Sequence, residues 1–262
     1  MITSVNNPKV KQLIQLKNRA RSRREEDAFV VEGIRMFREL PAGIVKEVYV
    51  TEEFLEKYKN LKQLKHFKYE VVTAEVFSRL SDTVTPQGVL AVVKCLHYQK
   101  EALFCKANPC LLLLEDIQDP GNLGTMFRTA EAAGVDGIVM SSQTVDVYNP
   151  KVVRSTMGSI FRVPFLIVPN MGEMVQELKQ TGTTVYAAAL KENAMIYTDA
   201  DYAKNCAILI GNEGNGLKKE TMLQADQCVI IPMNGAVESL NASISAAVLL
   251  YETARQRAAE HK

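Results

Sequence analysis

The segment Ile208–Leu217, ILIGNEGNGL, begins as an apolar run and ends as a loop with three glycines, two asparagines and one glutamate. Consecutive apolar residues that stop at a turn are typical of a strand buried on both faces of a parallel sheet. Ligands of such sheets bind beyond the carboxyl ends of the strands. We therefore expect an α/β fold here, with a ligand at the end of this strand.

The glycine loop does not match a phosphate site. Its spacing, GxxGxG, differs from the dinucleotide fingerprint GxGxxG, and the Lys-Ser/Thr pair of a P-loop is missing. A pyrophosphate would also be repelled by Glu213. The loop favours a neutral or cationic ligand that approaches bare backbone. The alternative is a tight turn in which Gly214 and Gly216 only provide positive φ angles.

Two more predicted strands end in unusual loops. After CLLLLEDI (110–117), a helix starts near Asn122, passes Arg128 and stops at Gly134. Gly124 and Arg128 share one helical face, which leaves room beside the guanidinium. The alternative for Arg128 is a surface ion pair with Glu131.

The third loop follows CVIIPM (228–233), and either Ser239 or Asn241 begins the last helix. Ser239 could be a plain N-cap. Residues 239–260 are expected to form a helix whose apolar side includes Ile244, Ala247, Val248 and Tyr251. Three such loops at strand ends of one sheet favour a composite site over three unrelated turns.

Helix and strand patterns alternate along the whole chain of 262 residues. We expect a smaller N-terminal α/β domain over 1–96, a linker over 97–107 and a larger α/β domain with a parallel sheet over 108–262.

The net charge of +1 hides an asymmetry, because residues 1–100 carry +6 and residues 101–262 carry −5. No acidic residue precedes Glu25, whereas basic residues are frequent there. Such a block is either a solvated face or a surface for a polyanion, most simply nucleic acid. The candidate RNA-contacting residues are Lys9, Lys11, Arg19, Arg21, Arg23 and Arg24.

The five cysteines and three histidines are scattered without metal-ligand spacing, so we expect no metal site and reduced thiols in a cytoplasmic protein. No apolar stretch approaches the roughly 20 residues that span a bilayer. We expect neither a membrane partner nor a secretory signal.

The segments NLGTMFRTAEAAG (122–134), IGNEGNGL (210–217) and IPMNGAVESLNASISAAVLLYE (231–252) resemble the three motifs of the SpoU-type (TrmH-like) RNA 2′-O-ribose methyltransferases of the SPOUT superfamily. They occur in the family's order, without departures. More loosely, NPKVKQL (7–13) and VVEGIRMFREL (30–40) are similar to the substrate-binding domain of members that act on ribosomal RNA.

The resemblance implies a C-terminal SPOUT α/β domain with a trefoil knot, a homodimer, and S-adenosyl-L-methionine as the methyl donor. The donor carries a sulfonium cation, which suits a loop that favours a neutral or cationic ligand. Its adenine and its amino acid end can be contacted by main-chain groups, which the glycines allow to come close. The donor-binding residues that the resemblance implies are Gly211, Ile231, Leu240, Leu190 and Met233.

The implied reaction is methyl transfer to a ribose 2′-hydroxyl in RNA, most simply in 23S ribosomal RNA. The implied catalytic residues are Arg128, Asn122, Glu213, Ser239 and Asn241. Arginine resists deprotonation, so we expect Arg128 to bind the target phosphate and to lower the hydroxyl's pKa electrostatically rather than to act as the base. Glu213 could orient Arg128 or accept a proton. The alternatives are a transfer RNA methyltransferase and a non-catalytic RNA-binding or ribosome-assembly protein on the same fold.

Overall fold

The computed structural model describes residues 1–104, 106–191 and 193–260. The chain divides into two compact units. Unit 1 comprises Met1–Leu96 and Asp146–Phe161, and unit 2 comprises His97–Val145 and Arg162–Lys262. Each is described by itself.

Unit 1 is built on a four-stranded sheet in the order β1-β4-β2-β3, in which only the β2–β3 pair is parallel. The strands are β1 (Ala28–Glu32), β2 (Val45–Val50), β3 (Glu70–Val71) and β4 (Val89–Lys94). The helices are α1 (Pro8–Asn18), α2 (Ala20–Glu26), α3 (Ile34–Arg38), α4 (Glu52–Lys57), α5 (Lys62–His66), α6 (Ala74–Leu80) and α8 (Pro150–Thr156), with the 3₁₀ turns η1 (Ala42–Ile44) and η3 (Ser159–Phe161).

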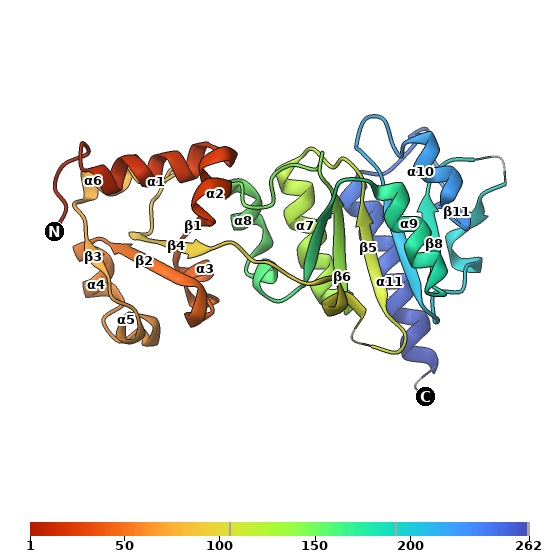
Figure 1. The fold of residues 1–262 in the computed structure, drawn as a ribbon, viewed down its shortest axis with the longest axis horizontal. Helices are drawn as coiled ribbons and strands as arrows, with labels where there is room; N and C mark the ends of the chain where they lie inside the picture. Colours follow the sequence, from red (N-terminus) through yellow and green to blue (C-terminus); the bar gives the residue numbers. More distant parts are fainter. Residues whose placement is uncertain (105, 192, 261–262) are drawn as a thin grey trace. The chain divides into compact units, whose positions relative to one another are not determined.

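The helices of unit 1 lie on both sides of its sheet (Figure 1). Apolar side chains of α1 and α6 form one buried cluster with β1, β2 and β4. Phe37 of α3, Phe54 of α4 and Phe67 stack edge-on in a second aromatic group. Asn7 caps α1 by accepting the Lys9 N–H, and Pro8 occupies the first turn, as the NPKVKQL pattern predicts.

Unit 2 contains a seven-stranded, all-parallel sheet in the order β7-β6-β5-β10-β8-β11-β9. The strands are β5 (Cys110–Leu114), β6 (Gly137–Ser141), β7 (Phe165–Val168), β8 (Thr184–Ala188), β9 (Met195–Ile196), β10 (Cys206–Ile210) and β11 (Gln227–Ile230). The helices are α7 (Pro120–Ala133), α9 (Met171–Gln180), α10 (Lys219–Gln224) and α11 (Ala242–Glu260), with the 3₁₀ turns η2 (Lys100–Phe104) and η4 (Tyr197–Asp199).

Helices cover the sheet of unit 2 on two faces. Helix α11 packs against α7 and β10, and α9 packs against α10 and β8. In Figure 1, α9 lies in front of the sheet and α11 behind it. Every residue of β5, β6 and β10 is buried, which is why these strands read as continuous apolar runs. The predicted α/β fold with a parallel sheet is therefore confirmed, while the knot stays a prediction.

The two units differ in places from the domains expected from sequence. Residues 97–107 group with unit 2 and are not a free linker, because η2 buries Leu103 in the sheet's core. Residues 146–161 were expected in the second domain but group with unit 1. The reason is packing: the Phe29 ring lies 4.6 Å from that of Tyr148 and 6.5 Å from that of Phe161.

Candidate functional site

The loops that follow β5, β10 and β11 leave the sheet of unit 2 at its carboxyl edge. The β5 loop leads into α7, the β10 loop is the GNEGNG segment, and the β11 loop leads into α11. Strands β5 and β10 are neighbours, and β11 is separated from β10 only by β8. The parallel topology therefore places all three predicted motifs on one edge.

A chain of hydrogen bonds joins the three motifs. Glu213 accepts hydrogen bonds from the Asn122 side chain at 2.9 Å and from the backbone N–H groups of Gln118 and Asp119 at 3.1 Å. Asn122 in turn accepts a hydrogen bond from the Asn241 side chain at 3.1 Å. Asn122, Glu213 and Asn241, predicted from three distant segments, thus lie together.

Glu213 remains an ionised carboxylate in this position. Burial alone would raise its pKa, but hydrogen bonds from Asn122 and from the backbone of Gln118 and Asp119 outweigh this effect and lower the pKa below its ordinary value. A carboxylate with a lowered pKa is a weak proton acceptor. Among the described residues it forms no hydrogen bond or ion pair with Arg128. Its hydrogen bonds tie the glycine loop to the start of α7, and the two expected roles stay predictions.

The glycine loop is a small closed turn. Asn212 and Gly216 exchange backbone hydrogen bonds of 3.0 and 2.9 Å, and the Asn212 side chain accepts the N–H groups of Gly214 and Asn215. A Cβ at Gly211 would lie 2.3 Å from the Gly216 carbonyl carbon. Position 211 therefore requires glycine, because the backbone at the end of the loop passes close to it. Gly216 has φ +66°, whereas Gly214 is not in the left-handed region.

Two acidic residues at the end of β5 hold the far side of this loop, and sequence reasoning did not single them out. Buried Glu115 accepts hydrogen bonds from the Lys218 N–H at 2.9 Å and the Thr221 hydroxyl at 2.6 Å. Asp116 forms a 2.7 Å ion pair with Lys218. Burial works against the ionised Asp116, but the Lys218 and Ser141 hydrogen bonds lower its pKa. The available signal was an acidic pair directly after four leucines.

Four of the five predicted donor-binding residues line one cavity of about 100 Å³. Ile231 and Met233 follow β11, Leu240 precedes α11, and Leu190 follows β8. The wall of the cavity is mostly apolar. A few side-chain oxygens also line it, and no cationic side chain of a described residue does. The polar side chains that line it are those of Glu238, Ser239 and Ser245.

Gly211, the fifth predicted donor-binding residue, is buried at the end of β10 but is not a wall of this cavity. Leu190 is 74% exposed, so the cavity opens to solvent beside it.

Asn241, not Ser239, caps the last helix. The Asn241 side chain accepts the N–H groups of Ser243 at 2.9 Å and Ile244 at 3.4 Å. Ser239 faces the cavity, and its hydroxyl makes no hydrogen bond within the described residues. The expected choice between the two is thereby decided, and the Ser239 hydroxyl remains available to a ligand.

Arg128 lies exposed on α7. The alternative expectation, an ion pair with Glu131, is wrong because Glu131 is held by Arg162 through two hydrogen bonds. Within the described residues Arg128 has neither a hydrogen bond nor an ion pair. Its guanidinium is available for an anion. Hydrogen bonds join Asn122, Glu213 and Asn241 to one another, but none joins Arg128 to them within the described residues.

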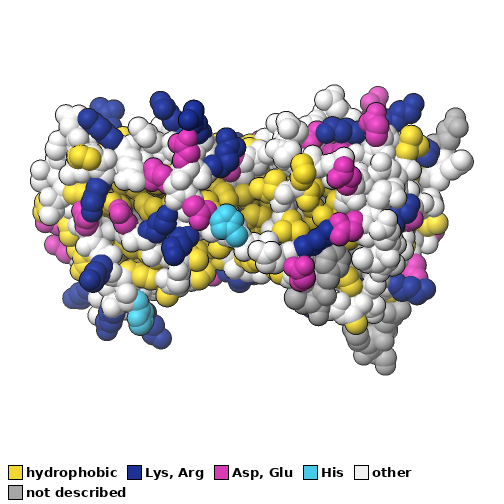
Figure 2. All heavy atoms as spheres, viewed as in Figure 1, with side chains coloured by type: hydrophobic (Ala, Val, Ile, Leu, Met, Phe, Trp, Pro, Cys, Tyr) yellow, Lys and Arg dark blue, Asp and Glu magenta, His cyan; other side chains and the backbone are white. Residues whose placement is uncertain are grey.

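The predicted RNA-contacting residues of unit 1 fall into three groups. Lys11, Arg19 and Arg24 are exposed, and Lys9 and Arg21 are exposed but paired with Glu70 and Glu25. Arg23 alone of the six is buried. Figure 2 shows Lys and Arg side chains over α1 and α2 and also around α5, so basic charge is not confined to the N-terminal block.

Arg23 is a correction to the predicted set. It is 4% exposed, donates to the backbone oxygens of Leu16 and Lys17 at 2.7 and 2.8 Å, and forms a 2.6 Å ion pair with Asp146. The ion pair holds the segment before α8 against α2. An arginine so enclosed holds the fold together and does not reach RNA.

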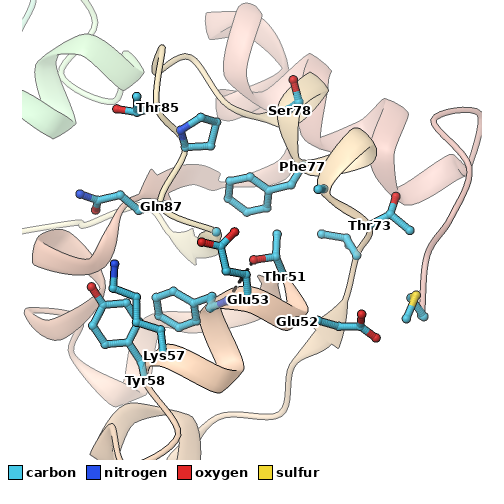
Figure 3. Close-up of a pocket in the computed structure, with 16 residues that line it drawn as sticks. Thr51, Glu52, Glu53, Lys57, Tyr58, Thr73, Phe77, Ser78, Thr85 and Gln87 are labelled. Atoms are coloured by element: carbon cyan, nitrogen blue, oxygen red, sulfur yellow. Dashed lines mark hydrogen bonds between the residues drawn. The ribbon is translucent and has the colours of Figure 1, made fainter.

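Other features of the described chain add no further chemistry to this site. No group of three or more possible metal ligands occurs among the described residues, and Cys105 and His261 lie outside them. No described helix is both long and apolar enough to cross a bilayer. A cavity of about 740 Å³ lies in unit 1, between α4, α6 and the loop before β4 (Figure 3). None of its walls comes from the three motifs.

Comparisons with known proteins agree on the family of both units. Residues 109–251 match the model of the SpoU rRNA Methylase family, and residues 7–91 match that of the MRM3-like substrate binding domain. The 23S rRNA (guanosine(2553)-2′-O)-methyltransferase RlmP of Bacillus subtilis is 35% identical over 252 residues, which cover 95% of this chain and 97% of that protein.

Two solved structures show how far the likeness extends. The AdoMet-bound rRNA methyltransferase from Sinorhizobium meliloti has a TM-score of 0.83 at 28% identity and covers 97% of each chain. The A. aeolicus TrmH/SpoU tRNA modifying enzyme has a TM-score of 0.54 at 26% identity and covers 59% of this chain and 78% of its own.

Proposed function

The chain belongs to the SpoU rRNA Methylase family, and from this premise we propose that it methylates one ribose 2′-hydroxyl of 23S ribosomal RNA. The protein is an S-adenosylmethionine-dependent RNA 2′-O-methyltransferase. The observation that carries the residue roles is the hydrogen-bonded chain from Glu213 through Asn122 to Asn241, which ties the three motifs to one strand edge.

The cavity after β11 has a lining that suits part of the methyl donor, and at about 100 Å³ it would hold only that part. Its apolar walls, Ile231, Leu240 and Met233, suit the faces of an adenine ring, and strand-end backbone suits its edge. Glu238 is its one charged side chain, which suits a sulfonium cation better than a phosphate. When bound there, S-adenosylmethionine supplies an electrophilic methyl group. The protein's part is then alignment and charge stabilisation.

We assign Arg128 to the target nucleotide. Arginine keeps its proton in proteins, so it acts as a cation and not as the base. Its exposed guanidinium, without a protein partner among the described residues, binds the phosphate next to the ribose and stabilises negative charge that develops on the 2′-oxygen. Ser239, released from the capping role, holds the target hydroxyl by a hydrogen bond.

Asn122 and Asn241 are positioning residues in this scheme. Asn122 uses both side-chain groups in the chain that leads to Glu213, because its NH₂ donates to Glu213 and its oxygen accepts from the Asn241 NH₂. Together they fix the start of α7, which carries Arg128, relative to the start of α11, which follows Ser239. Their contribution is therefore to hold the cation and the hydroxyl-binding residue at a constant separation.

Ribosomal RNA is favoured over transfer RNA by the extent of the likeness. The 23S rRNA enzyme matches nearly the whole chain, while the transfer RNA enzyme matches little more than half of it. Unit 1, with its exposed Lys11, Arg19 and Arg24, supplies the RNA contacts.

The 23S target is tested by mapping 2′-O-methylation in ribosomal and transfer RNA from cells with and without the protein. The proposal expects one ribose of 23S rRNA to lose its methyl group. Loss from a transfer RNA instead would contradict it. A non-catalytic RNA-binding protein would change neither, and its titration with S-adenosylmethionine would release no heat.

We also propose that unit 2 forms a homodimer through α11. The predicted apolar side of this helix is real but faces outward: Ile244 is 49% exposed and Tyr251 56% exposed, with half-buried Val248 between them. Such a stripe suits a second copy of the chain. Sedimentation should give a dimer that Ile244→Glu dissociates, and a monomeric wild-type protein would contradict this.

We place the protein in the cytoplasm, which agrees with the free thiols of its described cysteines.

A further inference from the structure

A second cavity in unit 1, of about 230 Å³, lies between the start of α3, the loop before β4 and the end of α8. Its walls include Arg35, Met36, Gln87, Arg154 and Met157. None of these residues belongs to the basic N-terminal block or to the methyl-transfer site. The cavity combines two cations, an amide and two thioethers with the Thr83 and Thr85 hydroxyls and the Glu32 carboxylate. Both carboxylate oxygens of Glu32 already accept hydrogen bonds from residues 81–83.

Arg154 holds donors that the protein does not use. Its Nη1 is buried, lacks a hydrogen-bond partner in the described chain, and lies 3.8 Å from Glu32 and 3.6 Å from Asp82. Glu32 is satisfied instead by the loop that follows α6. Arg23, by contrast, donates to backbone and carboxylate oxygens at 2.6 to 2.8 Å. A buried donor without an acceptor is costly, so a ligand oxygen here would relieve that cost.

Gln87 presents a second fixed donor. Its side-chain oxygen accepts the Ile34 N–H at 2.9 Å, which sets the orientation of the amide. The amide NH₂ has no acceptor within the described residues. Gln87 lines both this cavity and the larger cavity of unit 1, and Figure 3 shows its side chain directed away from Phe77.

Met157 is held in an unusual conformation at the end of α8. Its φ is 52°, in the left-handed region where a helix usually ends in glycine, and its side chain is 36% exposed. An apolar side chain kept at such a position points to a function for that side chain. Met36, which is 3% exposed, also lines the cavity. Thioethers pack well against flat rings.

We propose that this cavity binds one unstacked nucleobase of the RNA substrate and selects bases with a carbonyl on the edge that it contacts. The proposal rests on the proposed RNA substrate. Arg154 and the Gln87 amide donate and cannot accept from the base, so the carbonyls of uracil and guanine match them. The amino groups of cytosine and adenine, which take the place of those carbonyls, would face donors. Arg35 binds the adjoining phosphate, and Met157 covers the ring.

Such a subsite gives unit 1 sequence selection, which phosphate contacts from α1 and α2 cannot provide. Single-stranded loops and bulges supply unstacked bases, so the proposal also restricts the kind of RNA structure that unit 1 recognises.

The test compares binding of fluorescent oligo(U) and oligo(A) nonamers to the full-length protein by anisotropy at one fixed salt concentration. Wild type should prefer oligo(U) by about tenfold. Gln87→Leu and Met157→Gly should each bring that ratio near one. Gln15→Leu, which changes another exposed glutamine of unit 1, should keep it. Met157→Gly should fold normally, because glycine favours the left-handed conformation.

Titration of the same preparations with S-adenosylmethionine separates the two levels of the argument. If wild type binds the donor and RNA but binds both nonamers equally, or if both variants keep the preference, the nucleobase subsite is refuted and the methyltransferase assignment stands. If wild type binds neither RNA nor donor, the proposed function fails and this inference fails with it.

Discussion

Replacement of Gly211 by alanine should disable the enzyme, while the same change at Gly214, three residues away, should not. A Cβ on Gly211 would lie 2.3 Å from the Gly216 carbonyl carbon and 2.4 Å from the Leu217 nitrogen. Carbon atoms pack at roughly 3.5 Å, so the returning backbone must move by about 1 Å. A Cβ on Gly214 would meet only the Asn212 side-chain oxygen, at an ordinary 3.5 Å.

The displaced backbone carries Glu213 away from its three donors. We expect Gly211→Ala to lower the free energy of unfolding by about 1–3 kcal/mol, as overpacked sites do. Because a misplacement of about 1 Å near a site can cost about 100-fold in rate, methyl transfer should fall by that order.

The assay is transfer of labelled methyl groups to ribosomal RNA at saturating donor, with urea unfolding of both variants. Gly214→Ala should stay within about twofold of wild type in rate, since its contact is ordinary. If Gly211→Ala is as active as Gly214→Ala, the closed loop does not position the site and the reasoning is wrong.

Substitutions at four further positions test separate parts of the account. Arg128→Ala should reduce methyl transfer by at least about 100-fold with unchanged donor affinity, whereas activity kept by Arg128→Lys would show that charge suffices without the bidentate fork. Arg23→Met should lower the free energy of unfolding by about 3 kcal/mol or more, because it removes the buried partner of Asp146. Arg24→Met should change the free energy of unfolding by less than about 0.5 kcal/mol. It should also reduce the slope of RNA affinity against salt concentration by about one released ion. Similar losses for both would contradict the two assignments. The pKa of Glu213 is lowered in the folded protein, so the carboxylate stabilises the fold above its ordinary pKa of 4.5, and this stabilisation is lost as the pH falls through the lowered value. The difference in unfolding free energy between wild type and Glu213→Gln at pH 7 should therefore disappear below about pH 4.5. A difference that is constant with pH would refute this prediction.

Much of the fold could be predicted from local pattern. The fully buried strands β5, β6 and β10 read as unbroken apolar runs, and α7 ends at Gly134, whose φ is +75°. Short elements with weak patterns, such as α5 and α10, were not expected. Their places are set by neighbours in space: the first residues of α10 are held by Glu115, 106 residues before Thr221.

The site was predicted unevenly, for a physical reason. Asn122, Glu213 and Asn241 stand in three segments that resemble the family's motifs, so the resemblance found them. The role of Glu213 could not be predicted, because its donors include the backbone N–H groups of Gln118 and Asp119. Every residue except proline has a backbone N–H, so the residue type does not show which of these groups donates to Glu213.

In unit 1 the charge pattern predicts one residue wrongly. Arg23 and Arg24 are adjacent and chemically identical in the sequence, but one is buried against Asp146 and the other is exposed. The segment that contains Asp146 was assigned to the other domain, so its contact with Arg23 could not be foreseen.

The central claim is that the turns after β5, β10 and β11 form one site, in which a methyl group passes from the bound donor to a ribose oxygen. The most direct measurement incubates purified protein with labelled S-adenosylmethionine and ribosomal RNA and then identifies the labelled nucleoside after complete digestion. The account predicts a single 2′-O-methylnucleoside, absent with Arg128→Ala. A label on a base, or no label in the presence of RNA that the protein binds, would contradict it.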